Sequence, residues 1–138
     1  MKEQGFQDVL FIGDDLILLN NLLCHIFQDK KIPVIFASTW NEGRKYIEKN
    51  KLKLIILDAG LISRLKPSFV VPLIKKTRRP ICLINAKSDM WIYRIDEQIN
   101  GVPVMVYKQP LIIDRFLKTI QRLLKTDLTQ RFYPKGEE

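Results

Sequence analysis

The sequence predicts an α/β fold in which one sheet of five parallel strands is covered by helices on both faces. Short apolar runs rich in β-branched residues alternate with segments of helical apolar spacing, and no internal repeat or low-complexity segment interrupts them. Continuous apolar runs indicate strands buried on both faces, and strands that alternate with helices are typical of a doubly wound sheet. The length of 138 residues suits a single domain with one core.

The five expected strands share short, nearly continuous apolar sequences. They run from Val9 to Gly13, Val34 to Ala37, Leu54 to Leu57, Ile81 to Ile84 and Val104 to Tyr107. We place the domain at residues 7–126, because the apolar pattern fades after that point. Residues 127–138 are a C-terminal tail or the first part of a linker.

Helical spacing fills the connections between these runs. The first helix is marked by Leu16, Leu19, Leu22, Leu23 and Ile26, and the second runs from Trp40 to Lys49 with Thr39 or Ser38 as its cap. Pro67 and Pro72 interrupt the third connection, so any helix there is short, kinked or starts late.

Two further helices complete the pattern. Ser88 can cap a fourth helix that runs to about Asn100, where Gly101 supplies a stop. Pro110 opens a fifth helix, whose buried stripe consists of Ile113, Phe116, Leu117, Ile120, Leu123 and Leu124.

The composition argues against several classes of protein. No apolar run approaches the length that spans a bilayer, and the start from Met1 to Gly5 is not followed by a signal-peptide stretch, so we expect a cytoplasmic protein that does not contact membranes. Cys24 and Cys82 are expected to be buried thiols rather than a disulfide, and His25 an ordinary helix residue.

A net charge of +8 is compatible with an anionic partner. The basic residues gather in Lys75, Lys76, Arg78 and Arg79, around Lys49, Lys51 and Lys53, and along Arg115, Lys118, Arg122 and Lys125. No recognition-helix motif or RNA-binding aromatic signature accompanies them, which argues against direct nucleic-acid binding.

Charged residues follow three of the expected strands. The first strand is followed by Asp14 and Asp15, the third by Asp58 and the fifth by Lys108. Ligands of open parallel sheets bind beyond the carboxyl ends of the strands, and in the flavodoxin-like order 2-1-3-4-5 strands one and three are neighbours there. We therefore expect the three carboxylates to converge. For the Asp pair alone, capping of the next helix is an equally simple interpretation.

Converging carboxylates need a counter-charge, which points to phosphoryl chemistry. Mg²⁺ binds one or two carboxylates, a backbone carbonyl, waters and phosphate oxygens. Lys108 adds a mobile positive charge for a phosphoryl oxygen. With these partners Asp58 is a candidate nucleophile that forms an aspartyl phosphate.

These residues resemble those of bacterial two-component receiver domains, from about Asp8 to Lys125. The resemblance is carried by Val9 to Leu23, Leu54 to Asp58, Pro80 to Lys87, and Asn100-Gly101 followed seven residues later by Lys108. It implies the five-stranded receiver fold, with Asp14 and Asp15 as the acidic metal-binding pair and Asp58 as the phosphoacceptor. It further implies Mg²⁺ binding by the Gly60 carbonyl, Lys108 on the phosphoryl group, and a histidine kinase or phosphotransfer protein as donor.

Three departures separate the chain from the family pattern. Asn85 replaces the Ser or Thr at the end of the fourth strand; its amide can still donate a hydrogen bond to phosphate. The aromatic switch position of the fifth strand falls on Met105, with Tyr107 in the other register. Gln109 separates Lys108 from Pro110, where the family commonly has Lys-Pro.

These departures leave two functions open. The first is a phosphoacceptor that signals through its surface and at most catalyses its own phosphorylation and dephosphorylation. The second is a pseudo-receiver, a phosphorylation-independent interaction or dimerisation module. In the family, the face formed by helix four, strand five and helix five often makes homodimers. Trp91 or Tyr93 would be exposed on the fourth helix for such a contact, or both are partly buried packing.

Overall fold

A computed structural model of the chain describes residues 8–18, 34–49, 52–97, 99, 101, 103–108 and 112–125. The strands are β1 (Asp8–Ile12), β2 (Val34–Ala37), β3 (Leu52–Asp58), β4 (Ile81–Ala86) and β5 (Val104–Lys108). They form one parallel sheet in the order β2-β1-β3-β4-β5, which confirms the predicted fold class and strand order.

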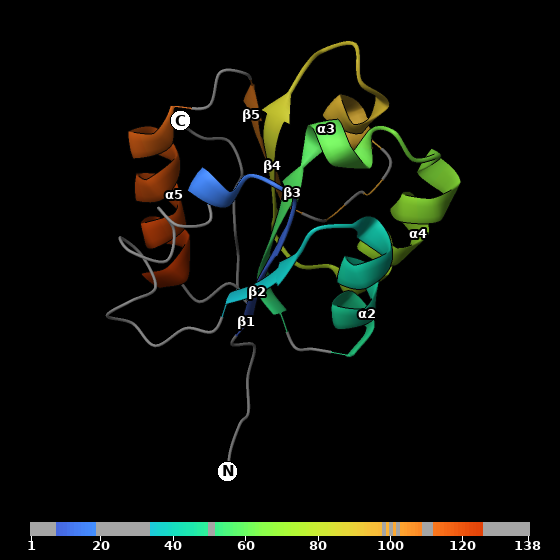
Figure 1. The fold of residues 1–138 in the computed structure, drawn as a ribbon, viewed down its shortest axis with the longest axis horizontal. Coiled ribbons are helices and arrows are strands. Elements are labelled where there is room, and N and C mark those ends of the chain that lie inside the picture. Colours follow the sequence, from blue (N-terminus) through green and yellow to red (C-terminus); the bar gives the residue numbers. More distant parts are fainter. Residues whose placement is uncertain are drawn as a thin grey trace.

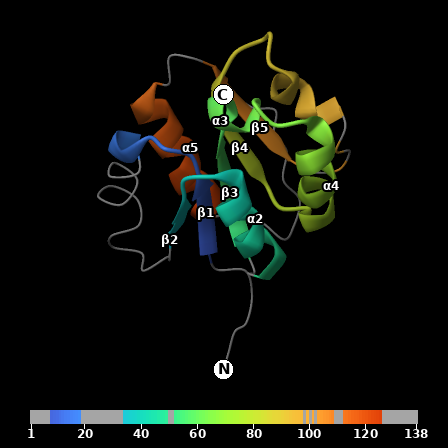
Figure 2. The same cartoon turned by 45° about the vertical axis from the view of Figure 1, so that its right-hand side comes forward.

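The helices cover both faces of this sheet (Figures 1 and 2). One face carries α2 (Trp40–Lys49), α3 (Ala59–Ile62), α4 (Pro67–Thr77) and the 3₁₀ helix η2 (Trp91–Glu97). The other carries α5 (Ile113–Lys125), with the helical turn of residues 16–18 beside it. No described helix is long and apolar enough to cross a membrane.

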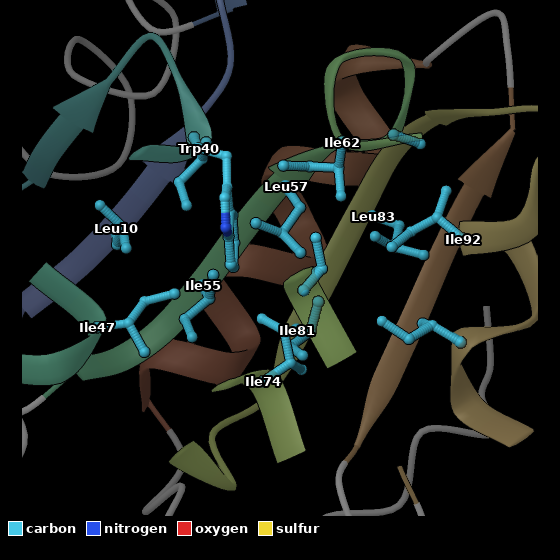
Figure 3. Packing of buried hydrophobic residues seen from close by; sticks show 14 of the residues in the cluster. Leu10, Trp40, Ile47, Ile55, Leu57, Ile62, Ile74, Ile81, Leu83 and Ile92 are labelled. Atoms are coloured by element: carbon cyan, nitrogen blue, oxygen red, sulfur yellow. The ribbon is translucent and has the colours of Figure 1, made fainter. Parts of the chain in front are cut away.

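Two apolar clusters hold the layers together, one on each face of the sheet. The larger cluster packs strand residues such as Leu10, Ile55 and Leu57 against the helices of the α2–α4 face, as Figure 3 shows. The smaller cluster packs the alternate strand residues, among them Phe11 and Ile56, against Leu18, Phe116 and Ile120. Because both faces are buried, the strands appear in the sequence as continuous apolar runs.

The start of α2 matches its predicted cap. The Thr39 hydroxyl accepts a hydrogen bond from the Glu42 backbone N–H at 3.2 Å, and Glu42 Oε1 accepts one from the Ser38 N–H at 3.0 Å. The first bond is that of an N-cap, whose side chain satisfies a free backbone donor of the first helical turn. The second bond ties Glu42 to the residue that precedes the cap. Of the two predicted candidates, Thr39 is therefore the cap.

The third connection starts its main helix late, as the prolines predict. Pro67 occupies the first turn of α4, where its missing N–H costs nothing, and a separate short helix, α3, precedes it. Pro72 lies inside α4, and Arg78 closes the helix in a left-handed conformation.

The predicted fourth α-helix is wrong in type and length. The chain forms the 3₁₀ helix η2 from Trp91 to Glu97, interrupted at Arg94, and Ser88 lies in the preceding turn rather than at a cap. Ile92 and Ile95 are both fully buried, and their spacing of three places them on one side of a 3₁₀ helix. Gly101 has φ +86°, the left-handed conformation expected of a stop residue.

Several predictions fall outside the described residues. They concern the first helix beyond Leu18, with Cys24 and His25, the loop with Gln109 and Pro110, and residues 127–138. Cys82 is a buried free thiol, as predicted, and burial raises its pKa. In α5, Phe116 and Ile120 are buried and Leu117 packs beside them.

Candidate functional site

The charged residues identified in the sequence lie at the carboxyl edge of the sheet. Gly13, Asp14 and Asp15 directly follow β1, while Asp58 ends β3 and Lys108 ends β5. β1 and β3 are hydrogen-bonded neighbours, and β4 separates β3 from β5. The aspartates therefore meet at the point where the strand order reverses, which is where ligands of such sheets bind.

Asp58 is buried and held by the backbone that follows it. Its side chain is 7% exposed, and its Oδ1 accepts a hydrogen bond from the Gly60 N–H at 3.0 Å, which caps α3. Burial raises the pKa of the Asp58 carboxyl above its ordinary value. The backbone N–H groups of Gly60 and Leu61 lower this pKa, whereas the charges of Asp14 and Asp15 raise it, and the net shift is upward.

Asp15 has two roles that the sequence left as alternatives. Its Oδ1 accepts a hydrogen bond from the Leu18 N–H at 3.0 Å, so it caps the helical turn that begins at Leu16. Its charge nevertheless raises the pKa of Asp58, as does that of the exposed Asp14. Capping and convergence on Asp58 therefore occur together.

Gly13 permits the close approach of the strand ends. A Cβ at this position would lie 2.9 Å from the Cβ of Asp58 and 2.9 Å from the ring of Phe11. Both distances are too short for carbon atoms in van der Waals contact. A residue without a side chain is therefore required where the end of β1 approaches Asp58.

The oxygen donors at this edge fit a hard divalent cation. They are the carboxylates of Asp14, Asp15 and Asp58, whose charges interact. The Gly60 carbonyl, proposed from the sequence as a further ligand, accepts a hydrogen bond from the Ser63 hydroxyl at 3.3 Å. Within the described ranges no three acidic, imidazole or thiol side chains form a group that could hold a metal by themselves. Mg²⁺ is usually bound by one or two carboxylates with a carbonyl and waters, and mutual repulsion of these aspartates favours such an ion.

Lys108 contacts an aromatic ring in this structure, whereas the sequence suggests a phosphoryl group at Asp58 as its partner. Its side chain is exposed, and its Nζ lies 5.8 Å from the centre of the Tyr93 ring in η2. The described charges that shift the pKa of Asp58 are those of Asp14 and Asp15, and no lysine is among them. The structure thus brings the three aspartates together and leaves Lys108 beside an aromatic ring.

Asn85 sits at an irregular point of β4. Leu83 pairs with Val106 and Ala86 pairs with Lys108, so β4 has one residue more than β5 between these pairs. Asn85 has φ +59°, a left-handed conformation that Asn tolerates and β-branched residues strongly disfavour. Asparagine therefore suits the backbone conformation at this position.

The fifth strand corrects one prediction. Met105 and Tyr107 lie on the same face, because residues two apart on a strand point the same way, and both pack against the smaller cluster. The Tyr107 ring meets that of Phe116 edge to face, with centroids 5.2 Å apart. The Tyr107 side chain therefore points to the same face of the sheet as that of Met105, and not to the other face as predicted.

The aromatic residues of η2 are partly buried. The Trp91 indole N–H donates a hydrogen bond to the Leu65 carbonyl at 2.9 Å, and both Trp91 and Tyr93 pack against the larger cluster. The packing interpretation of these residues is thus confirmed. The contact of Tyr93 with Lys108 was not predicted, because no short sequence motif joins η2 to the end of β5.

Comparison with solved structures supports the fold, whereas comparison with known sequences finds no match. No model of a protein family matches the sequence, and no curated protein sequence is similar to it. The non-phosphorylated receiver domain of HemR from Leptospira biflexa is similar at a TM-score of 0.68 and 21% identity, over 92% of this chain and 99% of that one.

Two further solved structures have the same architecture. The chemotaxis response regulator CheY4 of Vibrio cholerae has a TM-score of 0.59 and 19% identity, over 86% of this chain and 98% of that one. A two-component response regulator from Clostridium difficile has a TM-score of 0.62 and 20% identity, over 86% of this chain and 96% of that one. The chain therefore has the fold of response-regulator receiver domains over most of its length.

Proposed function

We propose that this chain is a receiver domain that accepts a phosphoryl group on Asp58 and signals through the resulting change at its surface. The observation that carries the proposal is the placement of Asp58. It is a buried carboxylate at the switch in strand order, with Asp14 and Asp15 close enough to raise its pKa. A buried carboxylate among others costs stability, and such arrangements are concentrated at functional sites.

The residues around Asp58 suit a nucleophile. The N–H groups of Gly60 and Leu61 offset part of the rise that burial causes in its pKa, and the 3.0 Å bond from Gly60 fixes the orientation of the carboxylate. In the proposed step an Asp58 oxygen forms a bond to phosphorus. The bond from phosphorus to the donor's imidazole nitrogen breaks, and the leaving imidazole keeps the electron pair.

Mg²⁺ is the cofactor we propose, held by Asp14, Asp15, Asp58 and the Gly60 carbonyl. It would supply positive charge that offsets the phosphoryl oxygens. Lys108 is proposed as the second positive group and Asn85 as an amide donor to the same oxygens.

The proposed donor is a histidine kinase or phosphotransfer protein. Leu16 and Ile17 directly follow the acidic pair and are 64% and 77% exposed. Large apolar side chains at the rim of a charged site suit a protein partner that covers the site while it donates the phosphoryl group.

Beryllofluoride titration tests this proposal. The phosphoryl mimic should produce a saturable change in tryptophan fluorescence only when Mg²⁺ is also present, and Asp58→Asn should abolish the change. Because asparagine also caps helices well, the variant should remain folded. A folded wild-type protein that shows no change with both reagents would contradict phosphoryl acceptance.

The second candidate is a pseudo-receiver that acts through protein contacts alone. Two observations favour it: Asn85 is left-handed where the family has a hydroxyl residue, and Lys108 lies beside Tyr93. The proposed contact surface is the η2–β5–α5 face, where the Val106 side chain is exposed on the edge strand. Self-association that does not change with beryllofluoride would favour this candidate.

A further inference from the structure

The contact between Lys108 and Tyr93 joins the proposed phosphoryl site to η2. The Lys108 ammonium lies 5.8 Å from the centre of the Tyr93 ring, within the range of a cation–π interaction. Tyr93 lies in η2, which follows β4, and Lys108 is the last residue of the next strand, β5. A change in the position of the lysine therefore changes what the ring of Tyr93 contacts.

The Tyr93 side of this contact is well anchored. Ile92 and Ile95 are fully buried on either side of it, and the Tyr93 N–H donates to the Met90 carbonyl at 3.1 Å. The Trp91 indole also bonds to the Leu65 carbonyl at 2.9 Å. The ring is thus held in place by the packing of η2 rather than by the lysine.

The Lys108 side is the part free to move. Lys108 is the last residue of β5, pairs with Ala86 just beyond the Asn85 irregularity, and has an exposed side chain. A lysine ammonium is a compact charge on a flexible stem, so it can exchange one partner for another. The ring of Tyr93 and a phosphoryl group on Asp58 are then competing partners for the same ammonium.

We propose that Tyr93 is a positioning residue that holds Lys108 away from Asp58 until a phosphoryl group is present. This rests on the proposed function of Asp58. The phosphoryl oxygens draw the lysine from the ring, and the uncovered face of Tyr93 becomes part of the surface of η2. An exposed cation–π contact biases the lysine by about two- to five-fold.

Paired variants of Tyr93 in the full chain test this role. Tyr93→Leu removes the ring and should tighten beryllofluoride binding with Mg²⁺ by about two- to five-fold. In this variant Lys108 gives up no contact with the ring when it moves to the phosphoryl mimic. Tyr93→Phe keeps the ring and should bind like the wild type. When Lys108→Ala is added to both variants, the difference in beryllofluoride affinity between Tyr93→Leu and Tyr93→Phe should vanish, as a double-mutant cycle requires.

Proton NMR of the Lys108 side chain tests the contact itself without a phosphoryl mimic. The ε-methylene protons should be shifted upfield by the ring in wild type and Tyr93→Phe, and should return to ordinary values in Tyr93→Leu. Ordinary shifts in all three proteins would overturn the proposal. Equal beryllofluoride affinities of Tyr93→Leu and Tyr93→Phe would also overturn it, whereas no binding by any protein would refute phosphoryl acceptance by Asp58 and this role with it.

Discussion

At the scale of one residue, Asp58 shows what the burial of a carboxylate costs the folded protein. Its carboxylate is buried within range of the charges of two other acidic groups, and it alone is buried among the charged residues whose burial the structure describes. An uncharged side chain of the same shape would be more favourable in the folded state.

Asp58→Asn is therefore expected to stabilise the fold at neutral pH. The pKa of Asp58 is raised above its ordinary value of 3.8, so the folded protein binds this proton more tightly than the unfolded chain does. The contribution of Asp58 to stability consequently falls as pH rises through the raised pKa, and the ionised residue is destabilising above it. Thermal unfolding followed by circular dichroism should give the variant a midpoint a few degrees above wild type.

The pH dependence distinguishes this cause from a general gain in packing. The difference between variant and wild type should shrink as pH falls toward 3.8, where the wild-type carboxyl is also protonated in the folded state. Asp89→Asn, at an exposed turn position, serves as the control and should change the midpoint little. A variant less stable than wild type at neutral pH would contradict this interpretation of Asp58.

The left-handed conformation of Asn85 leads to a second prediction at the scale of one residue. Introducing a β-branched hydroxyl residue with Asn85→Thr should destabilise the fold by about 1–2 kcal/mol, because such a residue is disfavoured at φ +59°. Asn85→Gly adopts this conformation readily and should cost less than the threonine variant. Urea unfolding of the two variants measures the difference, and a threonine variant as stable as wild type would show that the left-handed conformation is not required.

At the scale of elements, the fold depends on how closely the helices approach the strands. Gly43 lies in α2 directly over β1, and a Cβ there would collide with the side chain of Ile12, which is fully buried. The helix can lie this close to the sheet only because the position has no side chain. The same requirement places Gly13 between Phe11 and Asp58 at the edge of the site.

Gly43→Ala is accordingly expected to destabilise the protein by about 1–3 kcal/mol through overpacking. Alanine raises intrinsic helix propensity by up to about 1 kcal/mol, which offsets part of this loss. Asn41→Ala, at an exposed position of the same helix, gains propensity without the collision and should be neutral or stabilising. Chemical denaturation measures the free energy of unfolding of both variants. Equal stability of the two would show that α2 can move away from β1 at no cost.

At the scale of the whole molecule, the sequence predicts the architecture well for a physical reason. Strands buried on both faces leave continuous apolar runs such as those around Leu10 and Ile56, and these runs predict a parallel sheet without further information. Once the strands are known, their carboxyl ends share one edge, so the convergence of Asp14, Asp15 and Asp58 follows from topology.

The parts that could not be predicted depend on how neighbouring elements pack against one another. The left-handed Asn85, the 3₁₀ form of η2 and the position of Lys108 beside Tyr93 are each set by packing across β4, β5 and η2. Helical periodicity does not separate a 3₁₀ helix from an α-helix when Ile92, Ile95 and Ile99 are all buried. Asn85 itself is the one available signal, since asparagine is enriched in left-handed positions.

The most direct test of phosphoryl acceptance by Asp58 is the intact mass of the protein after incubation with acetyl phosphate and Mg²⁺. We expect the wild-type protein to gain the mass of one phosphoryl group, only when Mg²⁺ is present, and Asp58→Asn to gain nothing. A folded wild-type protein that gains no mass, or an Asp58→Asn variant that gains as much as wild type, would contradict the assignment of Asp58 as the phosphoacceptor.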